Sequence, residues 1–195
     1  YRPTRRPLAR VLRAVAKRST VRKLGELQPA SGGFLEAAPL TAFVTMSLAA
    51  TGLSGHPVAR RGAAFLRETV RQDGSWPIDV NLATWVTTLS VGALGADAGD
   101  LDRPAVRRWL LDQQHRRQHV YTRAAPGGWA WTDRSGAVPD ADDTAGALLA
   151  LRSLGPADAE AKSAAALGAA WLADVQNADG GVPTFCRGWG RLPFD

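Results

Sequence analysis

The chain alternates between two kinds of segment that differ in where their apolar residues fall. In the first kind, a threonine, ten mostly apolar or small residues and a glycine follow one another without a gap, at Thr41–Gly52, Thr84–Gly95 and Thr144–Gly155. Apolar residues on nearly all sides predict helices buried within the domain, and the glycine is typical of a helix C-terminus. The pattern therefore predicts inner helices over residues 39–51, 80–94 and 142–154.

The segments between these carry more charge and end in a recurring group of Gln, Gly and an aromatic residue. Copies occupy residues 28–34, 70–76 and 176–182, with Val70 and Val182 as departures, and a stretched copy runs from Gln114 to Trp129. We expect the Gln to donate to neighbouring backbone, the Gly to form a tight turn and the aromatic residue to anchor packing. Outer helices are predicted over residues 7–27, 57–70, 103–117 and 157–176, with no convincing strand.

These elements form an all-helical array of hairpins, with spacings of 43 and 60 residues between equivalent threonines. Such periods fit an open superhelix or a closed double ring of helices, and the apolar inner helices favour the ring. The predicted fold class is all-α, an α/α toroid or helical-hairpin barrel. A ring of about six hairpins needs on the order of 250 residues. We therefore expect residues 1–195 to be a single partial toroid domain, an incomplete internal segment of a longer protein.

The formal charge of +6 suggests nucleic acid or an anionic membrane until it is located. Residues 1–23 hold nine Lys and Arg and no acid, so the rest of the chain is net −3. Apolar residues recur there at helical spacing, at Leu8, Val11, Leu12 and Val15. This basic amphipathic helix packs its stripe on the next repeat or lies on anionic lipid, and both interpretations stay open. Nucleic acid is disfavoured, because no aromatic or motif context accompanies the charge.

An acidic cluster breaks the repeat. The two residues before the first threonine of the repeat are Pro39-Leu40 in one copy and Leu82-Ala83 in another. In the third copy they are Asp142 and Asp143, with Asp140 just upstream. Helix capping explains one or two of these acids but not three together. Crowded carboxyl groups cannot all ionise easily, so one is expected to keep a proton near neutral pH and to serve as a general acid.

Aromatic residues flank the acids. Four tryptophans occupy anchor positions and are predicted to be structural: Trp76, Trp109, Trp129 and Trp171. The remaining three are freer to line a cavity, where ring faces can stabilise a cation: Trp85, Trp131 and Trp189. Trp131 is the preferred candidate, and Phe185 lies in the downstream aromatic segment. His115 and His119, on a polar and Arg-rich segment, are expected to be simple surface residues.

The run from Asp140 to Ala145 resembles the D-x-D-D-T-A acid motif of the squalene–hopene cyclase family of class II terpene cyclases. The Gln-Gly-aromatic groups resemble its repeated Q-W motif, and the segments 127–131 and 182–186 resemble family segments on either side of the acids. The resemblance makes Asp142 the proton donor, with Asp140 and Asp143 holding and tuning it. It implies a cation-stabilising role for Trp131, and it places Cys186 and Thr144 in the hydrogen-bonding surroundings of the acids.

The implied reaction is protonation of a terminal alkene of a polyprenyl hydrocarbon such as squalene, followed by ring closure and deprotonation. It requires no metal and no cofactor, and it implies a peripheral protein on the cytoplasmic side of a membrane, from which the substrate is drawn. Leu82 and Ala83 depart from the family pattern, and none of the three histidines matches the histidine that supports the acid. Two alternatives are a non-catalytic helical-repeat binding scaffold and a zinc-dependent protein prenyltransferase-like subunit, although the single cysteine, Cys186, disfavours zinc.

Overall fold

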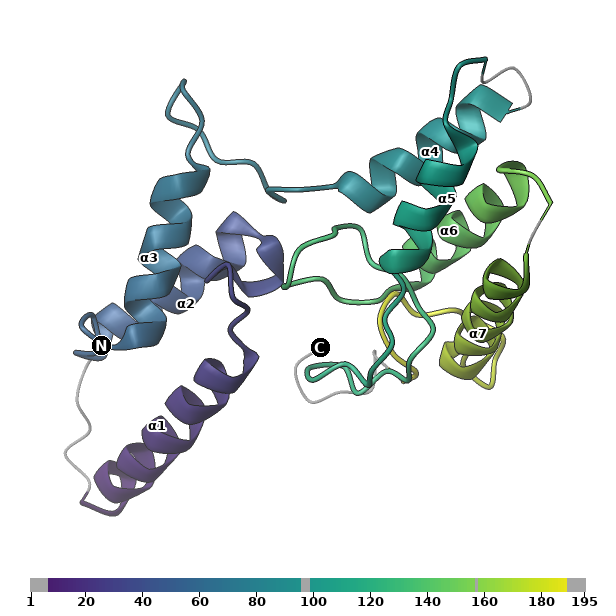
Figure 1. The fold of residues 1–195 in the computed structure, drawn as a ribbon. Helices are drawn as coiled ribbons and strands as arrows, with labels where there is room; N and C mark the ends of the chain where they lie inside the picture. Colours follow the sequence, from purple (N-terminus) through teal and green to yellow (C-terminus); the bar gives the residue numbers. More distant parts are fainter. Residues whose placement is uncertain (1–6, 96–98, 157, 189–195) are drawn as a thin grey trace. The chain divides into compact units, whose positions relative to one another are not determined.

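The computed structural model describes residues 7–95, 99–156 and 158–188, and its secondary-structure elements in these ranges are helices (Figure 1). The elements in chain order are α1 (Pro7–Leu27), the 3₁₀ helix η1 (Phe34–Glu36), α2 (Ala38–Ala50), α3 (Pro57–Thr69), α4 (Ala83–Leu94), α5 (Arg103–Asp112), α6 (Ala141–Ser153) and α7 (Ala159–Val175). In these described ranges, strand-like pairing is limited to two isolated bridges, Ala37 with Asp79 and Trp129 with Asp140. The predicted all-α class is confirmed.

Inner and outer helices alternate as predicted, but two boundaries differ. The helix α5 ends at Asp112 instead of residue 117, because the backbone N–H of His115 donates to Gly128 O at 2.9 Å and draws the chain out of the helix. The helix α4 begins at Ala83 instead of residue 80, because the side chain of Asn81 accepts the Ala83 N–H at 2.9 Å and forms a turn immediately before the helix. Side-chain and tertiary hydrogen bonds, and not local periodicity, therefore set both ends.

The chain forms two compact units, each described here by itself. Unit 1 comprises residues up to Val80 together with Arg134–Gly136, and it contains α1, η1, α2 and α3 around a core that includes Phe34, Leu48 and Val58. Unit 2 comprises residues 81–133 and those from Ala137 onward, and it contains α4 to α7. In unit 2, α6 packs against both α4 and α7. The single toroid domain expected over residues 1–195 stays a prediction.

The Gln-Gly-aromatic groups tie one outer helix to the next. Gln114 Nε2 donates to Gly127 O at 2.8 Å in its own turn and to Ala164 O of α7 at 2.9 Å. Gln28 makes the same pair of hydrogen bonds in unit 1, to its own turn and to α3. Gly127 has φ 125°, and a Cβ there would lie 2.7 Å from Leu167 O. The expected roles of the Gln and the Gly are confirmed.

The tryptophans at anchor positions are not equally buried. Trp129 and Trp171 are almost completely buried in unit 2, and Trp109 is partly buried against the same core as Trp129. Trp129 Nε1 donates to Leu110 O at 2.7 Å, which satisfies its polar atom within the core. Trp76 is half exposed, although its Nε1 donates to Leu66 O at 2.7 Å. Structural roles are thus confirmed for the buried tryptophans, while Trp76 anchors its turn at the surface.

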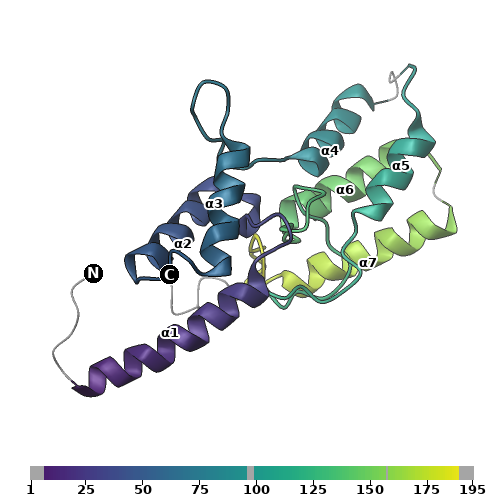
Figure 2. The same cartoon turned by 60° about the vertical axis from the view of Figure 1, so that its left-hand side comes forward.

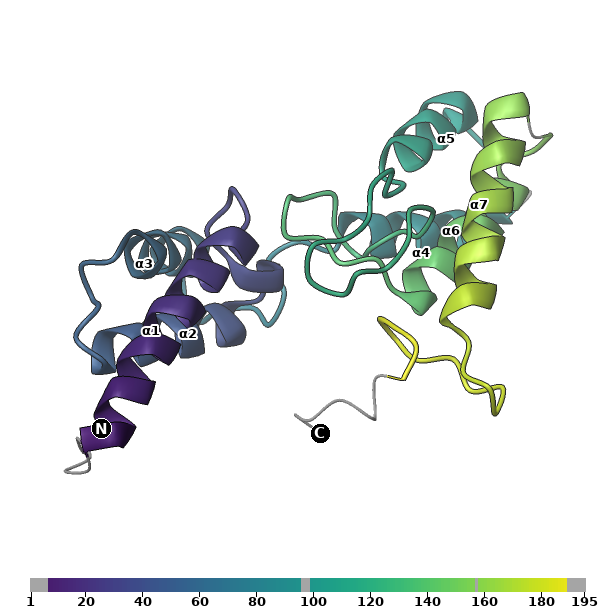
Figure 3. The same ribbon diagram turned by 90° about the horizontal axis from the view of Figure 1, so that it is seen from below.

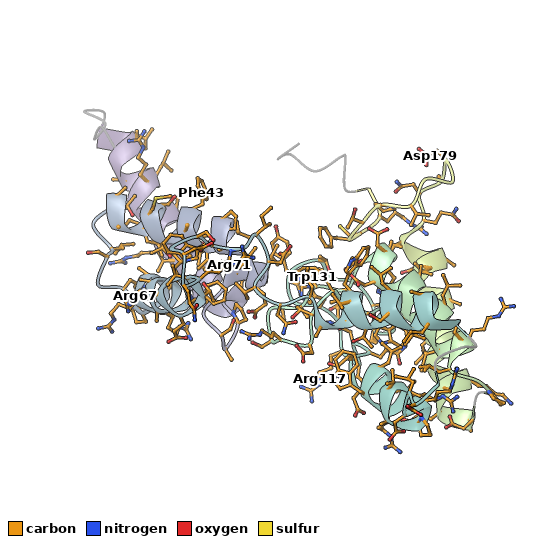
Figure 4. The ribbon with its side chains drawn as sticks, turned by 90° about the horizontal axis from the view of Figure 1, so that it is seen from above. Phe43, Arg67, Arg71, Arg117, Trp131 and Asp179 are labelled. Atoms are coloured by element: carbon orange, nitrogen blue, oxygen red, sulfur yellow. The ribbon has the colours of Figure 1, made fainter. Side chains whose placement is uncertain are left out.

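The prediction that the inner helices are buried on nearly all sides is wrong within each unit. The helix α2 buries Thr41 and Leu48, but Phe43, labelled in Figure 4, is 65% exposed. In unit 2, Val86 of α4 and Leu149 of α6 are also more than half exposed. The helix α2 packs on the outer helix α3, and α4 packs on α6, which also contacts the outer helix α7, so part of each inner helix's apolar surface is left uncovered in its unit.

The long helix α1 packs through its C-terminal half only. Val21 and Leu24 pack against the core of unit 1, while the N-terminal half extends beyond the other helices of that unit (Figure 2). At 100° per residue, the stripe from Leu8 to Val15 lies about 170° around the helix from the packed face. All four residues of the stripe are more than 60% exposed. The stripe therefore does not pack on the next repeat within unit 1.

Candidate active site

The three acids lie at the start of α6 and differ sharply in exposure. Asp140 is the N-cap residue, and its Oδ1 accepts the backbone N–H of Asp143 at 2.8 Å. Asp140 and Asp143 are each only 3% exposed, whereas Asp142, in the first turn, is exposed. Helix capping thus accounts for Asp140 Oδ1 only, and neither Asp143 nor Asp142 has a capping role.

Burial is the main cause of a raised pKa at both buried acids. It raises the pKa of Asp140 to about 8, with further contributions from the Asp143 carboxyl and from the charge of Asp142, partly offset by the N–H of Asp143. Burial likewise raises the pKa of Asp143 to about 6, and the carboxyl of Asp140 opposes this rise. The pair therefore holds a proton near neutral pH, which is what the crowding of three acids predicts.

Two oxygens of the buried pair have no conventional partner. Within the described residues, Asp140 Oδ2 and Asp143 Oδ1 are buried and accept no hydrogen bond from another group. An unpaired buried carboxylate oxygen is costly, and the cost falls when the carboxyl carries a proton. The geometry and the raised pKa values therefore agree that this pair is not doubly ionised at neutral pH.

Two extended segments hold the acid run from either side. Upstream, the N–H of Asp140 donates to Trp129 O at 2.9 Å, and the N–H of Trp129 donates to Thr144 Oγ1 at 2.9 Å. Downstream, the N–H of Ala141 donates to Thr184 O at 2.8 Å, where the segment following α7 passes the start of α6 (Figure 3). Thr144, fully buried, thus fixes the upstream segment directly behind the acids.

Aromatic side chains from these two segments meet. The rings of Trp131 and Phe185 are 6.3 Å apart between centroids and inclined at 63°, an edge-to-face contact. Trp131 is labelled in Figure 4, and its carbonyl oxygen accepts the N–H of Trp85 at 3.2 Å. The rings of Trp131 and Phe185 are thus in contact and the backbone of Trp85 is joined to Trp131, while the cavity role of the Trp85 ring stays a prediction and Trp189 lies outside the described residues.

Cys186 follows the Thr184 contact by two residues and is half-buried. Burial raises the pKa of its thiol, which keeps the group neutral. No hydrogen bond joins Cys186 to the three acids in the described part of the chain, so its expected place beside them stays a prediction. The described residues also contain no group of three or more His, Cys, Asp or Glu side chains arranged to hold a metal ion.

The two histidines are not the simple surface residues that the sequence predicts. His115 and His119 are half-buried, with ring centroids 5.9 Å apart, because α5 ends before them and the loop folds back. Burial lowers the pKa of His115 to about 4, and the neighbouring His119 adds to this. Burial also lowers the pKa of His119, and a hydrogen bond with the Ala137 backbone opposes the change. The pair ties the loop to the segment that precedes the acids.

One residue near the site was missed from the sequence. Asn81 lies three positions before Thr84, where the other two copies of the repeat have Ala38 and Ala141. Its Oδ1 accepts a hydrogen bond from Thr132 Oγ1 at 2.9 Å, next to Trp131. Aligning the three copies of the repeat, which identified the acids, would also have identified Asn81, since a polar residue stands there in place of alanine.

The chain thus combines a helical-hairpin scaffold with an acid cluster at an inner helix and adjacent aromatic rings. The chain belongs to the squalene–hopene cyclase family, since the family model described as the squalene-hopene cyclase C-terminal domain matches residues 81–190, more than half of its length. This match contains the acids, Trp131 and Phe185, so the family assignment and the site rest on the same residues.

Individual relatives agree with the family. The chain is 32% identical over 149 residues to a terpene cyclase–glycosyl transferase fusion protein of Humicola fuscoatra, covering 67% of this chain and 11% of that protein. It is 30% identical over 159 residues to the sporulenol synthase of Bacillus subtilis, covering 76% and 24%. It is 39% identical over 84 residues to a squalene hopane cyclase of Aspergillus fumigatus, covering 40% and 11%. The chain thus spans a quarter or less of the length of these relatives.

Proposed function

We propose that the full-length protein carrying this chain catalyses protonation-initiated cyclisation of a polyprenyl hydrocarbon such as squalene to a cyclic triterpene. The observation that carries this proposal is the division of the acids into a buried, proton-holding pair and one exposed carboxyl. Membership of the cyclase family supports the reaction class, and the names of the relatives support a terpene substrate. The particular substrate and product belong to the proposal.

Asp142 is the proton donor in this proposal, because it is the acid of the three that a substrate can touch. Asp142 acts when the proton shared by the three acids is on its carboxyl. Its O–H bond then breaks as a C–H bond forms at the terminal alkene, and the positive charge moves to the adjacent carbon. Successive alkenes of the chain attack that centre and close the rings. Loss of a proton from the final cation restores the formula of the substrate, so the overall reaction is an isomerisation.

The buried pair has a supporting task. Asp140 and Asp143 lie within three residues of Asp142 and hold a proton near neutral pH. Their neutral form limits the negative charge around Asp142, and their ionised form would draw its proton back. Trp131 and Phe185 present ring faces, and these stabilise a cation that is shielded from water. Acid strength and cation stabilisation are thereby provided by separate side chains of unit 2.

The experiment is incubation of the full-length protein with squalene in detergent, with products separated by gas chromatography and mass spectrometry. We expect cyclic isomers of the substrate from the wild type and none from Asp142→Asn. The matched control is Asp112→Asn, which removes an exposed acid at the end of α5 in the same unit and should leave turnover unchanged. Cyclisation that persists in Asp142→Asn, in protein with the wild-type circular dichroism spectrum, would remove Asp142 from its role.

We also propose that the protein binds peripherally to the cytoplasmic side of a membrane, since its hydrocarbon substrate dissolves in lipid. No helix within the described ranges is both long enough and apolar enough to span a bilayer. The support comes from α1, whose exposed stripe from Leu8 to Val15 faces away from unit 1 and lies in a region rich in Lys and Arg. Apolar insertion and attraction to anionic headgroups reinforce each other on such a helix.

Sedimentation with vesicles tests this second proposal. The full-length protein should pellet with vesicles of mixed phosphatidylcholine and phosphatidylserine, and Leu12→Asp should weaken binding, because the stripe then carries a charge. Leu167→Asp, at another exposed leucine, on α7, is the control and should bind as the wild type does. If Leu12→Asp pellets with the vesicles as well as Leu167→Asp does, the stripe on α1 does not bind the membrane.

A further inference from the structure

The first turn of α4 is held by groups outside the helix. Its N–H groups at Thr84 and Trp85 both donate to the carbonyl oxygen of Trp131, at 3.1 Å and 3.2 Å. The N–H of Ala83 donates to Asn81 Oδ1 at 2.9 Å. Backbone N–H groups that have no partner within the helix at its start thus bind the carbonyl oxygen of Trp131, the predicted cation-stabilising residue.

Asn81 links the start of α4 to the segment that contains Trp131. Its Oδ1 accepts from Ala83 N–H on one side and from Thr132 Oγ1, at 2.9 Å, on the other. Thr132 is buried and directly follows Trp131 in the chain. One side-chain oxygen therefore fixes both where α4 begins and where the peptide after Trp131 lies.

The ring of Trp131 has no polar anchor of its own. Its indole Nε1 is buried and, within the described residues, has no acceptor. Its ring packs edge-to-face with Phe185. Backbone hydrogen bonds on either side of Trp131, together with that packing, consequently determine where the ring face points.

We infer that Asn81 is a positioning residue that sets the orientation of the Trp131 ring and, through it, how far cyclisation proceeds before the cation loses a proton. This inference rests on the proposed function for its effect on products. A displaced ring stabilises the cation less well, and a cation held less well is quenched earlier. The effect on Trp131 itself requires no assumption about the substrate.

A graded series of substitutions separates the two hydrogen bonds. Asn81→Asp keeps an acceptor for both Ala83 and Thr132, and its charge suits a helix N-terminus. Asn81→Ser keeps an acceptor for the Ala83 N–H but is too short to reach Thr132. Asn81→Ala removes both bonds. The control is Asp102→Ala, which removes the cap hydrogen bond of α5 to Ala105 N without touching Trp131.

The first measurement is ¹⁹F NMR of full-length protein labelled with 5-fluorotryptophan, in which Trp131→Phe identifies the Trp131 resonance by its loss. We expect that resonance to shift or broaden in Asn81→Ala and in Asn81→Ser, and to stay in place in Asn81→Asp and Asp102→Ala. An unmoved Trp131 resonance in Asn81→Ser overturns the inference, even if Asn81→Ala fails to fold.

The second measurement is turnover of squalene. Asn81→Ala should lower kcat by roughly 3- to 10-fold, the effect of about one net hydrogen bond, with a smaller change in KM and a larger share of partly cyclised products. In a Trp131→Ala background the same substitution should alter the products no further. An additive effect there would show that Asn81 does not act through Trp131. A wild type with no turnover would defeat the proposed function, while the NMR result would still decide the positioning of Trp131.

Discussion

Replacing Asp140 with asparagine should remove the larger part of the stability that the acid cluster loses as the pH rises. Asp140→Asn keeps the Oδ1 acceptor for the Asp143 N–H, so the N-cap of α6 survives. The amide cannot ionise, and it resembles the protonated form of the carboxyl in shape and in its ability to donate a hydrogen bond. The variant therefore isolates the charge of Asp140 from its capping role.

The magnitude follows from the shift in pKa. The pKa of Asp140 rises from 3.8 in the unfolded chain to about 8 in the fold, so the folded state binds this proton more tightly. Its contribution to stability is fully present below pH 3.8 and is lost as the pH rises through about 8. At 1.36 kcal/mol per pH unit, and because Asp143 competes for the same proton, we expect a loss of about 3 to 5 kcal/mol.

The assay is urea unfolding of the full-length protein followed by tryptophan fluorescence at pH 5, 7 and 9. At pH 5, already above the unfolded pKa of 3.8, Asp140→Asn should be the more stable by only about 1.5 kcal/mol. At pH 9 the variant should be the more stable by about 3 kcal/mol or more. A difference of this size is a large part of the 5–15 kcal/mol typical of folded domains, at roughly 25 °C.

The matched control is Asp158→Asn, since Asp158 caps α7 by the same kind of hydrogen bond, to Ala161 N at 2.8 Å, but is exposed. Its pH profile should follow that of the wild type. Parallel profiles for wild type and Asp140→Asn would refute the reasoning, because they would mean that Asp140 is ionised in the fold without cost. A variant less stable at every pH would instead point to a hydrogen bond that the amide cannot reproduce.

Three further predictions concern the scaffold around the site. Gly127→Ala should cost about 2 to 4 kcal/mol in urea unfolding, because φ is 125° and its Cβ would meet Leu167 O, whereas Gly52→Ala, with open space at its Cβ, should cost only about 1 kcal/mol. Trp129→Phe should cost about 2 to 3 kcal/mol by the same measurement, because it removes the indole hydrogen bond to Leu110 O, which then keeps its bond from Gln113 N–H, and leaves a cavity in the core. His115→Gln should flatten the loss of stability between pH 6.5 and 4, a loss of up to about 3 kcal/mol, since burial lowers the pKa of His115 to about 4 and the unfolded chain binds that proton first. Equal slopes for wild type and His115→Gln in that range would contradict the last of these.

The helical content and the location of the acids could be read from the sequence because both depend on local patterns. Apolar residues at helical spacing, with glycine at the helix ends, predict helices close to the α-helices of the described ranges. Comparison of three copies in one register identified Asp140, Asp142 and Asp143, since the scaffold needs no acid at those positions. These inferences succeed because period and register are properties of the chain before it folds.

What the periodicity left open was decided by contacts between distant residues. The end of α5 depends on the pairing of His115 with Gly128, thirteen residues away, and the same loop buries two histidines that a local pattern places in solvent. The acids look alike in sequence, yet burial separates a proton-holding pair from the exposed Asp142. Asn81 becomes informative only when the fold brings Thr132 to it, 51 residues along the chain.

The sequence by itself thus determined which segments are helices, which copy of the repeat carries acids and to which family the motif points. The tertiary structure decided which acids lose water, which aromatic rings meet and which polar side chain holds them. The physical reason is that desolvation and directed hydrogen bonds depend on everything packed around a group. Helical periodicity and repeat register depend only on the order of residues along the chain.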